Sequence, residues 1–229
     1  MTLYDQPIFR IMGDRSLLVE LGADISSAVN QRVQELFCAL DRRRLKGILD
    51  LVPSYRSLLV IYDPLCISPD EIKTGINDIR KNPDQSRLPQ PQTVKIPVVY
   101  GGEHGPDLQR VAQYHNLTPR EVIGFHTRPS YRVYMIGFTP GYPYLGEVPD
   151  AIATPRRETP RTHVPKGSVG IAQKQTGIYP VNSPGGWQIV GWTPVKLFDP
   201  HSQPPSLLVM GDRVQFYAIT AQEAAQWQT

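Results

Sequence analysis

The chain has 229 residues, of which 40% are hydrophobic and 20% are charged, a composition that suits one large soluble domain or two small ones. Its formal net charge of +3 is too small for a typical nucleic-acid binder. The two cysteines, Cys38 and Cys66, form neither a disulfide framework nor a zinc site. With no signal sequence and no long apolar run, we expect a cytoplasmic protein.

The first elements expected along the chain are two strands and a helix. Alternating apolar residues from Leu17 to Leu21 predict a half-buried strand, and a short strand is expected before it at Ile8–Ile11. Apolar residues then recur at three- and four-residue steps from Ile25 to Leu40. This spacing places them on one face and predicts an amphipathic helix.

A hairpin and a second helix are expected next. Gly47–Val52 and Leu58–Tyr62 are apolar, β-branched runs separated by a short turn. Ser68-Pro-Asp-Glu71 has the pattern of a capping box and begins a helix. With a closing strand expected at Val94–Val98, the order of elements predicts a split β-α-β sandwich whose helices lie on one face of the sheet.

The segment Lys81–Gln92 is polar, rich in proline and without hydrophobic periodicity, which is typical of a linker. We therefore place a domain boundary near residue 90. Residues 1–88 are assigned to an N-terminal α+β domain and residues 89–229 to a C-terminal domain.

The C-terminal domain is expected to begin with helices and to continue with strands. Gly105–Leu108 begins a short helix, and Thr118–Glu121 begins another with a capping box. Gly and Pro turns separate the short strands that follow, which predicts a β-barrel or sandwich decorated by helices. A short helix or a frayed end is expected at Thr220–Thr229. The expected strands are Tyr131–Ile136, Val169–Ala172, Trp187–Trp192, Leu207–Met210 and Arg213–Tyr217.

A cationic segment is the first candidate for chemistry. Arg156, Arg157, Arg161 and Lys166 lie among prolines, and guanidinium groups on a stiff loop suit an anionic ligand such as a carboxylate or phosphate. A solvated charged face is the alternative. His163 lies in the same segment and is a candidate general acid or base, or else a surface histidine.

Aromatic residues cluster around the same segment in the sequence. Phe138, Tyr142, Tyr144, Tyr179 and Trp187 have rings that can line a pocket. Barrel core and an interface between chains are equally good interpretations of this set.

Small and polar residues complete the candidate site. Gln175 and Thr176 can hydrogen-bond an amide-like group, although turn capping explains Thr176 as well. Gly177, Gly185 and Gly186 can bring backbone N–H groups to a negatively charged oxygen, or they simply form tight turns. The five histidines have no metal-ligand spacing, and neither a Walker A loop nor a G-x-S-x-G elbow occurs, so no metal site is expected.

Short motifs occur along the C-terminal part of the chain at Pro97–Gly101, Gly105–Leu108, Phe138–Leu145, Thr154–Arg157, Val164–Pro165, Gly167–Gly170, Gln175–Gly177, Tyr179–Pro180, Ser183–Trp187, Gly191–Pro194 and Leu197–Pro200. Together they resemble the motifs of the allophanate hydrolase subunit 1 family, which is also described as KipI-like or as the family of the 5-oxoprolinase B subunit. The resemblance implies an α+β chain with a ferredoxin-like N-terminal domain and a cyclophilin-like β-barrel.

The resemblance also implies three possible functions. The first is the B subunit of a heteromeric, ATP-dependent 5-oxoprolinase, inactive alone and acting with two partners, a lactam-utilisation homologue (the A subunit) and a KipA-like, allophanate hydrolase subunit 2 homologue (the C subunit). The others are a KipI-like inhibitor of a sensor histidine kinase and the carboxyltransferase component of a urea carboxylase. We favour the first, because retained polar residues suit an enzyme better than a pure binder, with ATP bound in the complex at a position that this chain does not reveal.

For that function we assign roles to the candidate residues. The catalytic group is expected to comprise Arg156, Arg157 and His163. The substrate-binding group is expected to comprise Phe138, Tyr142, Tyr144, Arg161, Gln175, Thr176, Gly177, Tyr179, Gly185, Gly186 and Trp187.

Overall fold

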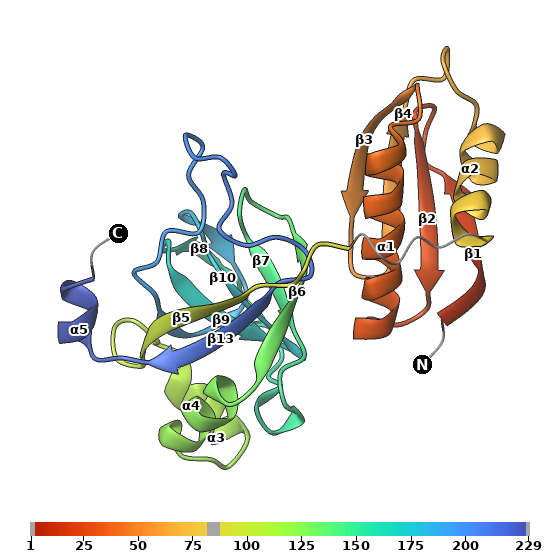
Figure 1. Ribbon diagram of the computed structural model, residues 1–229. Helices are drawn as coiled ribbons and strands as arrows, with labels where there is room; N and C mark the ends of the chain where they lie inside the picture. Colours follow the sequence, from red (N-terminus) through yellow and green to blue (C-terminus); the bar gives the residue numbers. More distant parts are fainter. Residues whose placement is uncertain (1–2, 82–87, 228–229) are drawn as a thin grey trace. The chain divides into compact units, whose positions relative to one another are not determined.

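The computed structural model describes residues 3–81 and 88–227, and the chain divides into two compact units, Met1–Gln90 and Pro91–Thr229 (Figure 1). Residues 82–87 of the expected linker lie outside the described residues. Residues 88–92 of that linker form neither helix nor strand. Within the described residues, none of the helices has the length and apolar character needed to span a membrane.

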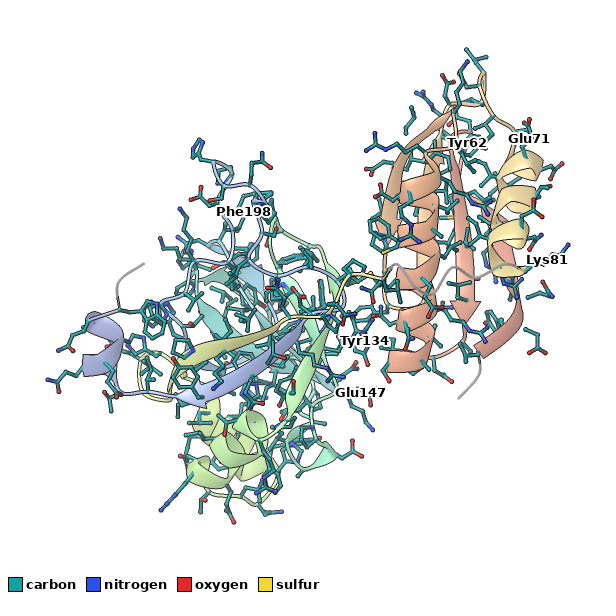
Figure 2. All side chains as sticks on the ribbon, viewed as in Figure 1. Tyr62, Glu71, Lys81, Tyr134, Glu147 and Phe198 are labelled. Atoms are coloured by element: carbon teal, nitrogen blue, oxygen red, sulfur yellow. The ribbon has the colours of Figure 1, made fainter. Side chains whose placement is uncertain are left out.

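The N-terminal unit is a four-stranded antiparallel sheet in the order β1-β2-β4-β3, and α1 packs on β2, β3 and β4 (Figure 1). Its elements are β1 (Leu3–Ile11), β2 (Ser16–Gly22), α1 (Ser27–Arg43), β3 (Ile48–Pro53), β4 (Ser57–Tyr62) and α2 (Pro69–Lys81). The capping box expected at Ser68 is confirmed, since the Glu71 carboxylate accepts from the Ser68 backbone N–H and hydroxyl. Figure 2 shows Glu71 on α2.

One expected strand of this unit is wrong. Val94–Val98 does not close the N-terminal sheet, because it belongs to β5 (Thr93–Tyr100). In the C-terminal unit, β5 pairs antiparallel with β12 (Gln188–Trp192) and parallel with β13 (Arg213–Ala218). Ile96 and Val98 on this strand are fully buried in the barrel core. The fourth strand of the N-terminal sheet is β1, which is longer than the strand expected at Ile8–Ile11.

The C-terminal unit is a closed barrel in the order β10-β7-β6-β13-β5-β12-β9 (Figure 1). The remaining barrel strands are β6 (Ser130–Ile136), β7 (Pro143–Gly146), β9 (Ser168–Ala172), β10 (Gln175–Ile178), β12 (Gln188–Trp192) and β13 (Arg213–Ala218). The accompanying helices are α3 (Leu108–Tyr114), α4 (Pro119–Thr127), the 3₁₀ turn η2 (Asp150–Ile152) and α5 (Ala221–Ala225). The expected α+β fold class, with a ferredoxin-like unit and a cyclophilin-like barrel, is confirmed.

The strand expected at Leu207–Met210 is wrong, because this segment is not extended in a sheet. The Asp212 carboxylate accepts from the Val209 backbone N–H, and the Asp212 N–H donates back to the Val209 carbonyl, so the segment turns into β13 instead. The short strands β7 and β10 were not predicted, because each has only four residues and contains glycine or proline.

The C-terminal unit also contains a small two-stranded sheet that is not part of the barrel. It consists of β8 (Arg161–Val164) and β11 (Ser183–Gly185), which pair antiparallel, and we call it the β8–β11 arm. Val164 of this arm is buried in an apolar cluster with Ala172 and Ile189 of the barrel wall. The arm therefore covers one outer face of the barrel.

Candidate functional site

Two of the three candidate arginines converge on one buried carboxylate. Asp107, immediately before α3, is 3% exposed, and Arg161 donates from Nη1 to its Oδ2 and from Nη2 to its Oδ1, both at 2.8 Å. Arg157 donates from Nη1 to Oδ1 at 3.0 Å. The Ile189 backbone N–H donates to Oδ2 at 2.7 Å. Four donors thus satisfy a carboxylate that burial alone would disfavour.

The Asp107 cluster, which we define as Asp107, Arg157 and Arg161, has one more cation than anion. Both arginine side chains are about three-quarters buried, being 27% and 24% exposed. The Nε atom of Arg157 is buried and has no hydrogen-bond partner among the residues that the structure describes. Arg157 and Arg161 therefore bind an anion, but that anion is part of this chain.

Arg156 has a different environment from its two neighbours. Its side chain is exposed, and its guanidinium lies over the Trp187 ring, 6.0 Å from the centroid, which is a cation–π distance. Within residues 3–81 and 88–227, no carboxylate forms an ion pair with it. Of the three arginines, Arg156 is the one that can bind an external carboxylate bidentately.

The expected aromatic group forms the cluster beneath Arg156. Tyr142, Tyr179 and Trp187 are almost fully buried, and Tyr144 packs against them. Tyr142 meets Tyr179 and Trp187 edge to face, with centroids 5.1 and 5.9 Å apart. Such geometry is favourable for aromatic packing. These rings form a second core between the barrel wall and the β8–β11 arm, and only its rim is open to solvent.

Burial alters the acidity of two tyrosines in this cluster. It raises the pKa of Tyr144 above the ordinary value, and the nearby Arg156 charge offsets this only in part. Burial likewise raises the pKa of Tyr179, against a smaller opposing effect of the neighbouring Tyr142 hydroxyl. Both phenols therefore stay protonated near neutral pH and can donate hydrogen bonds.

Phe138 lies at the edge of this cluster on a strained turn. Its φ is +68°, and the Thr139 N–H donates to the Gly137 carbonyl at 2.8 Å, which closes a three-residue γ-turn. A bulky residue with positive φ is uncommon and costs free energy. The ring is 60% exposed and meets Tyr142 edge to face. The turn thus holds an aromatic ring outward beside the Tyr142 cluster.

The base of the same loop is fixed by close packing. Gly141 has φ +78°, and a Cβ atom there would lie 2.6 Å from Phe198 Cβ (Figure 2 labels Phe198). A glycine is therefore required both by the backbone conformation and by the space.

Strand β10 places Gln175, Thr176 and Gly177 in different surroundings. Gln175 and Gly177 pair with Ala172 and Gly170 of β9, so they share the outer barrel face that carries the aromatic cluster. Gln175 Nε2 is buried without a partner among the described residues. At Gly177, an added Cβ would lie 2.7 Å from Tyr142 Oη, so this glycine makes room for the ring.

Thr176 instead points into the barrel, where it ends a buried hydrogen-bond chain that no sequence motif indicated. Its hydroxyl donates to the Gly170 carbonyl at 2.9 Å and so accepts from His126 Nε2 at 2.9 Å. His126 Nδ1 must then accept from the Tyr100 hydroxyl at 2.7 Å. These partners fix one tautomer of His126, and burial lowers its pKa to about 3. No sequence spacing links these three residues.

The remaining candidates are His163, Gly185 and Gly186. His163 is exposed on β8. Gly185 allows Tyr179 to pack, since a Cβ there would lie 2.3 Å from the Tyr179 hydroxyl. The Gly186 carbonyl accepts from the Arg157 N–H at 2.7 Å, which ties the arginine loop to the residue before Trp187.

Two hollows of the described surface are formed by residues of the N-terminal unit and not by residues of this site. One of about 330 Å³ is bordered by β1, α1 and α2 and includes Arg32, Glu35 and Arg80. Another of about 470 Å³ lies where α1 leads into β3. At the Arg156 site, the Arg156 side chain and the Phe138 ring are exposed. Among the described residues, no group of histidine, cysteine and acidic side chains is arranged to hold a metal.

Comparisons with known proteins agree with this architecture. Residues 7–208 match the family described as carboxyltransferase domain, subdomain C and D. A protein named as the B subunit of 5-oxoprolinase from Bacillus subtilis (strain 168) is 40% identical over 223 residues, which are 93% of this chain and 92% of that protein. The protein of the same name from Escherichia coli O157:H7 is 37% identical and covers 90% of this chain and 93% of its own length.

A solved structure shows the same fold. The crystal structure of TTHA0988 superimposes with a TM-score of 0.80 at 39% identity, over 90% of this chain. The match covers 40% of that longer protein. The chain therefore belongs to the carboxyltransferase subdomain C and D family, and the resemblance that its motifs indicate, to the family of allophanate hydrolase subunit 1, KipI-like proteins and the 5-oxoprolinase B subunit, is confirmed.

Proposed function

We propose that this chain is the B subunit of a heteromeric, ATP-dependent 5-oxoprolinase that opens 5-oxo-L-proline to L-glutamate. The observation that carries the proposal is the 40% identity, over 93% of the chain, to a protein named as the B subunit of 5-oxoprolinase. Its proposed partners are the lactam-utilisation and KipA-like homologues, which are the A and C subunits of such an enzyme.

The exposure of Arg156 and Phe138 supports a role that needs these partners. Arg156 and the Phe138 ring lie on an exposed surface, whereas Arg157 and Arg161 are already paired with Asp107. A second polypeptide seated over this surface would exclude water and strengthen the interactions of Arg156. The isolated chain is therefore proposed to be inactive.

Arg156 is proposed to bind the carboxylate of 5-oxoproline. The guanidinium is exposed and lies on Trp187, so part of its surface is already desolvated while its N–H groups remain accessible. A bidentate pair with a carboxylate adds both energy and orientation. The flat lactam ring can then pack against the neighbouring aromatic rim at Tyr144 or Phe138.

ATP is proposed to act in the complex, at a site that does not depend on a Walker A loop of this chain. An unstrained amide is a poor electrophile near neutral pH, and transfer of the γ-phosphoryl group of ATP to its carbonyl oxygen, with release of ADP, would make the carbonyl carbon more electrophilic. Water would then add to that carbon, the ring C–N bond would break, and a second water would hydrolyse the resulting acyl phosphate to glutamate and phosphate. Positive groups and oriented N–H donors stabilise the charge that develops in such a step.

The direct test is reconstitution. This chain would be co-purified with its lactam-utilisation and KipA-like partners, and glutamate release from 5-oxoproline would be followed with and without ATP. We expect release that requires ATP and all three chains. An intact, folded complex that releases no glutamate would exclude the proposal.

A second candidate, carboxyl transfer from biotin to urea, has one observation in its favour, the carboxyltransferase description of the matching family. It predicts that the chain works with a biotin carboxylase and a biotinyl carrier. Urea-dependent consumption of carboxybiotin by such a mixture, without 5-oxoproline turnover in the three-chain complex, would favour this candidate over the first.

A further inference from the structure

We propose that Asp107 is a positioning residue for substrate binding: it holds Arg157 and Arg161 inside the chain and so leaves Arg156 as the arginine of this group that meets the substrate's carboxylate. The inference rests on the proposed function for its substrate. The claim that Asp107 holds Arg157 and Arg161 in place can be tested without that function.

The hydrogen bonding of the Asp107 carboxylate is complete. Both Asp107 oxygens are occupied, since Oδ1 accepts from Arg157 and Arg161, and Oδ2 accepts from Arg161 and the Ile189 N–H. Arg161 uses its fork on this carboxylate in the same bidentate way in which it would bind a substrate carboxylate. Asp107 thus takes the place at which Arg157 and Arg161 could otherwise bind the substrate's carboxylate.

Hydrogen bonds also link the Asp107 cluster to the chain on both sides of Trp187, the ring beneath Arg156. The Arg157 N–H donates to the Gly186 carbonyl at 2.7 Å, on one side of Trp187. On the other side, Ile189 exchanges two hydrogen bonds with Asp107, one through the carboxylate at 2.7 Å and one from the Asp107 N–H at 2.9 Å. Asp107 therefore fixes both the arginine loop and the strand that follows the ring.

The Asp107 carboxylate also balances the charge of the buried arginines. Without the Asp107 carboxylate, Arg157 and Arg161 would be two largely buried cations without their anion, next to the charge of Arg156. Unpaired buried charges are strongly unfavourable, so these side chains would turn toward solvent or toward any anion that arrives. A substrate carboxylate would then find several competing partners, and its position would no longer be defined.

The test compares Asp107→Asn with Asp212→Asn in the three-chain complex. Asp212 is a matched control, because it is also a buried aspartate but accepts from the backbone N–H groups of Gln92 and Val209 rather than from arginines. For Asp107→Asn we expect the KM for 5-oxoproline to rise by about tenfold to a hundredfold, as for a misplaced binding group, with kcat nearly unchanged. Equal effects of the two variants on KM would overturn the inference.

A double-mutant cycle separates positioning from general damage. If Asp107 acts through Arg156, Asp107→Asn should raise KM in the wild-type chain but add little in the Arg156→Ala background. If the two increases instead multiply, Asp107 does not act through Arg156, and the inference is wrong.

Failure of the proposed function can be recognised separately. If the wild-type complex releases no glutamate, the substrate is wrong, and the claim that Asp107 holds Arg157 and Arg161 in place is then judged by amide hydrogen exchange of the full chain. The Arg157 and Ile189 amides should exchange faster in Asp107→Asn than in the wild type, and not in Asp212→Asn. Unchanged protection of both amides in Asp107→Asn would overturn the positioning role.

Discussion

At the scale of single residues, three arginines that are close together in the sequence have two different environments. Arg157 and Arg161 are largely buried and satisfy Asp107, whereas Arg156 is exposed on Trp187. The difference arises from a carboxylate far earlier in the chain, at a separation of 50 positions from Arg157. Stability and ligand binding are therefore expected to depend on different members of the group.

The stability of the chain should reveal this division. Arg157→Ala and Arg161→Ala each leave a buried carboxylate with fewer donors and should lower the free energy of unfolding by about 1–3 kcal/mol, more for the bidentate Arg161. Arg156→Ala is the control, because substitutions at exposed positions usually change stability by less than about 0.5 kcal/mol. Urea denaturation measures the free energy of unfolding of all three variants. Equal values for the three would contradict the assigned environments.

His126 predicts a pH dependence of stability. Burial lowers its pKa to about 3, whereas an exposed histidine of the unfolded chain has a pKa of about 6.5. Between these values only the unfolded state binds the proton, so stability should fall as the pH drops from about 6.5, by at most about 1.4 kcal/mol per unit. Above that pH the group contributes nothing to the slope. Burial also lowers the pKa of His115, which acts in the same direction.

The measurement is the free energy of unfolding of wild type and His126→Gln between about pH 6.5 and 5, above the ordinary range of carboxylates. We expect a shallower slope in the variant, whatever its absolute stability. Identical slopes would show that His126 is not held neutral in the barrel.

At the scale of elements, the β8–β11 arm and the loop at Phe138 decide which parts of the aromatic cluster are covered. Gly185 on the arm lies against the Tyr179 hydroxyl, and Tyr179 packs on Tyr142. The arm can approach the barrel wall because a side chain is missing at that point. The close contact of this arm is thus a packing requirement, whatever role its backbone has toward a ligand.

Gly185, the last residue of the arm, and Gly186, which follows it, provide a matched test. Gly185→Ala places a Cβ 2.3 Å from the Tyr179 hydroxyl, and because the ring is buried in the cluster, overpacking should destabilise the chain by about 1–3 kcal/mol. Gly186→Ala should have little effect, since its nearest neighbour would be 3.6 Å away. The stabilities of the two variants are compared by thermal unfolding. A Gly185→Ala chain as stable as Gly186→Ala would argue against the close contact of the arm.

The elements differ in how well the sequence predicts them. Helices with local signals were predicted well, since the capping boxes at Ser68 and Thr118 are present in the structure. The partner of a strand has no comparable local signal. The apolar run at Val94–Val98 therefore predicts a strand correctly but not the sheet to which the strand belongs. That sheet is determined only by the long-range pairing with β12 and β13.

At the scale of the whole molecule, the closed barrel brings distant segments to one outer face. Arg156, Tyr144, Gln175 and Trp187 come from separate loops and strands, yet the motifs that contain them were recognisable as one family pattern. The membership of the group could therefore be predicted from the motifs. Which of its side chains are buried and which are exposed at the surface could not. Asp107, which makes that distinction for the arginines, lies in a motif that gives no sign of its pairing.

The most direct test of the account is the KM for 5-oxoproline in ATP-dependent glutamate release by the three-chain complex, measured with wild type and with Arg156→Ala. Loss of a bidentate, charge-assisted pair should raise KM by about tenfold to a hundredfold while the complex stays assembled. Arg156→Lys keeps the charge but loses the fork, and it should restore only part of the affinity. An unchanged KM in a folded, active complex with Arg156→Ala would contradict the central claim that this exposed arginine binds the substrate.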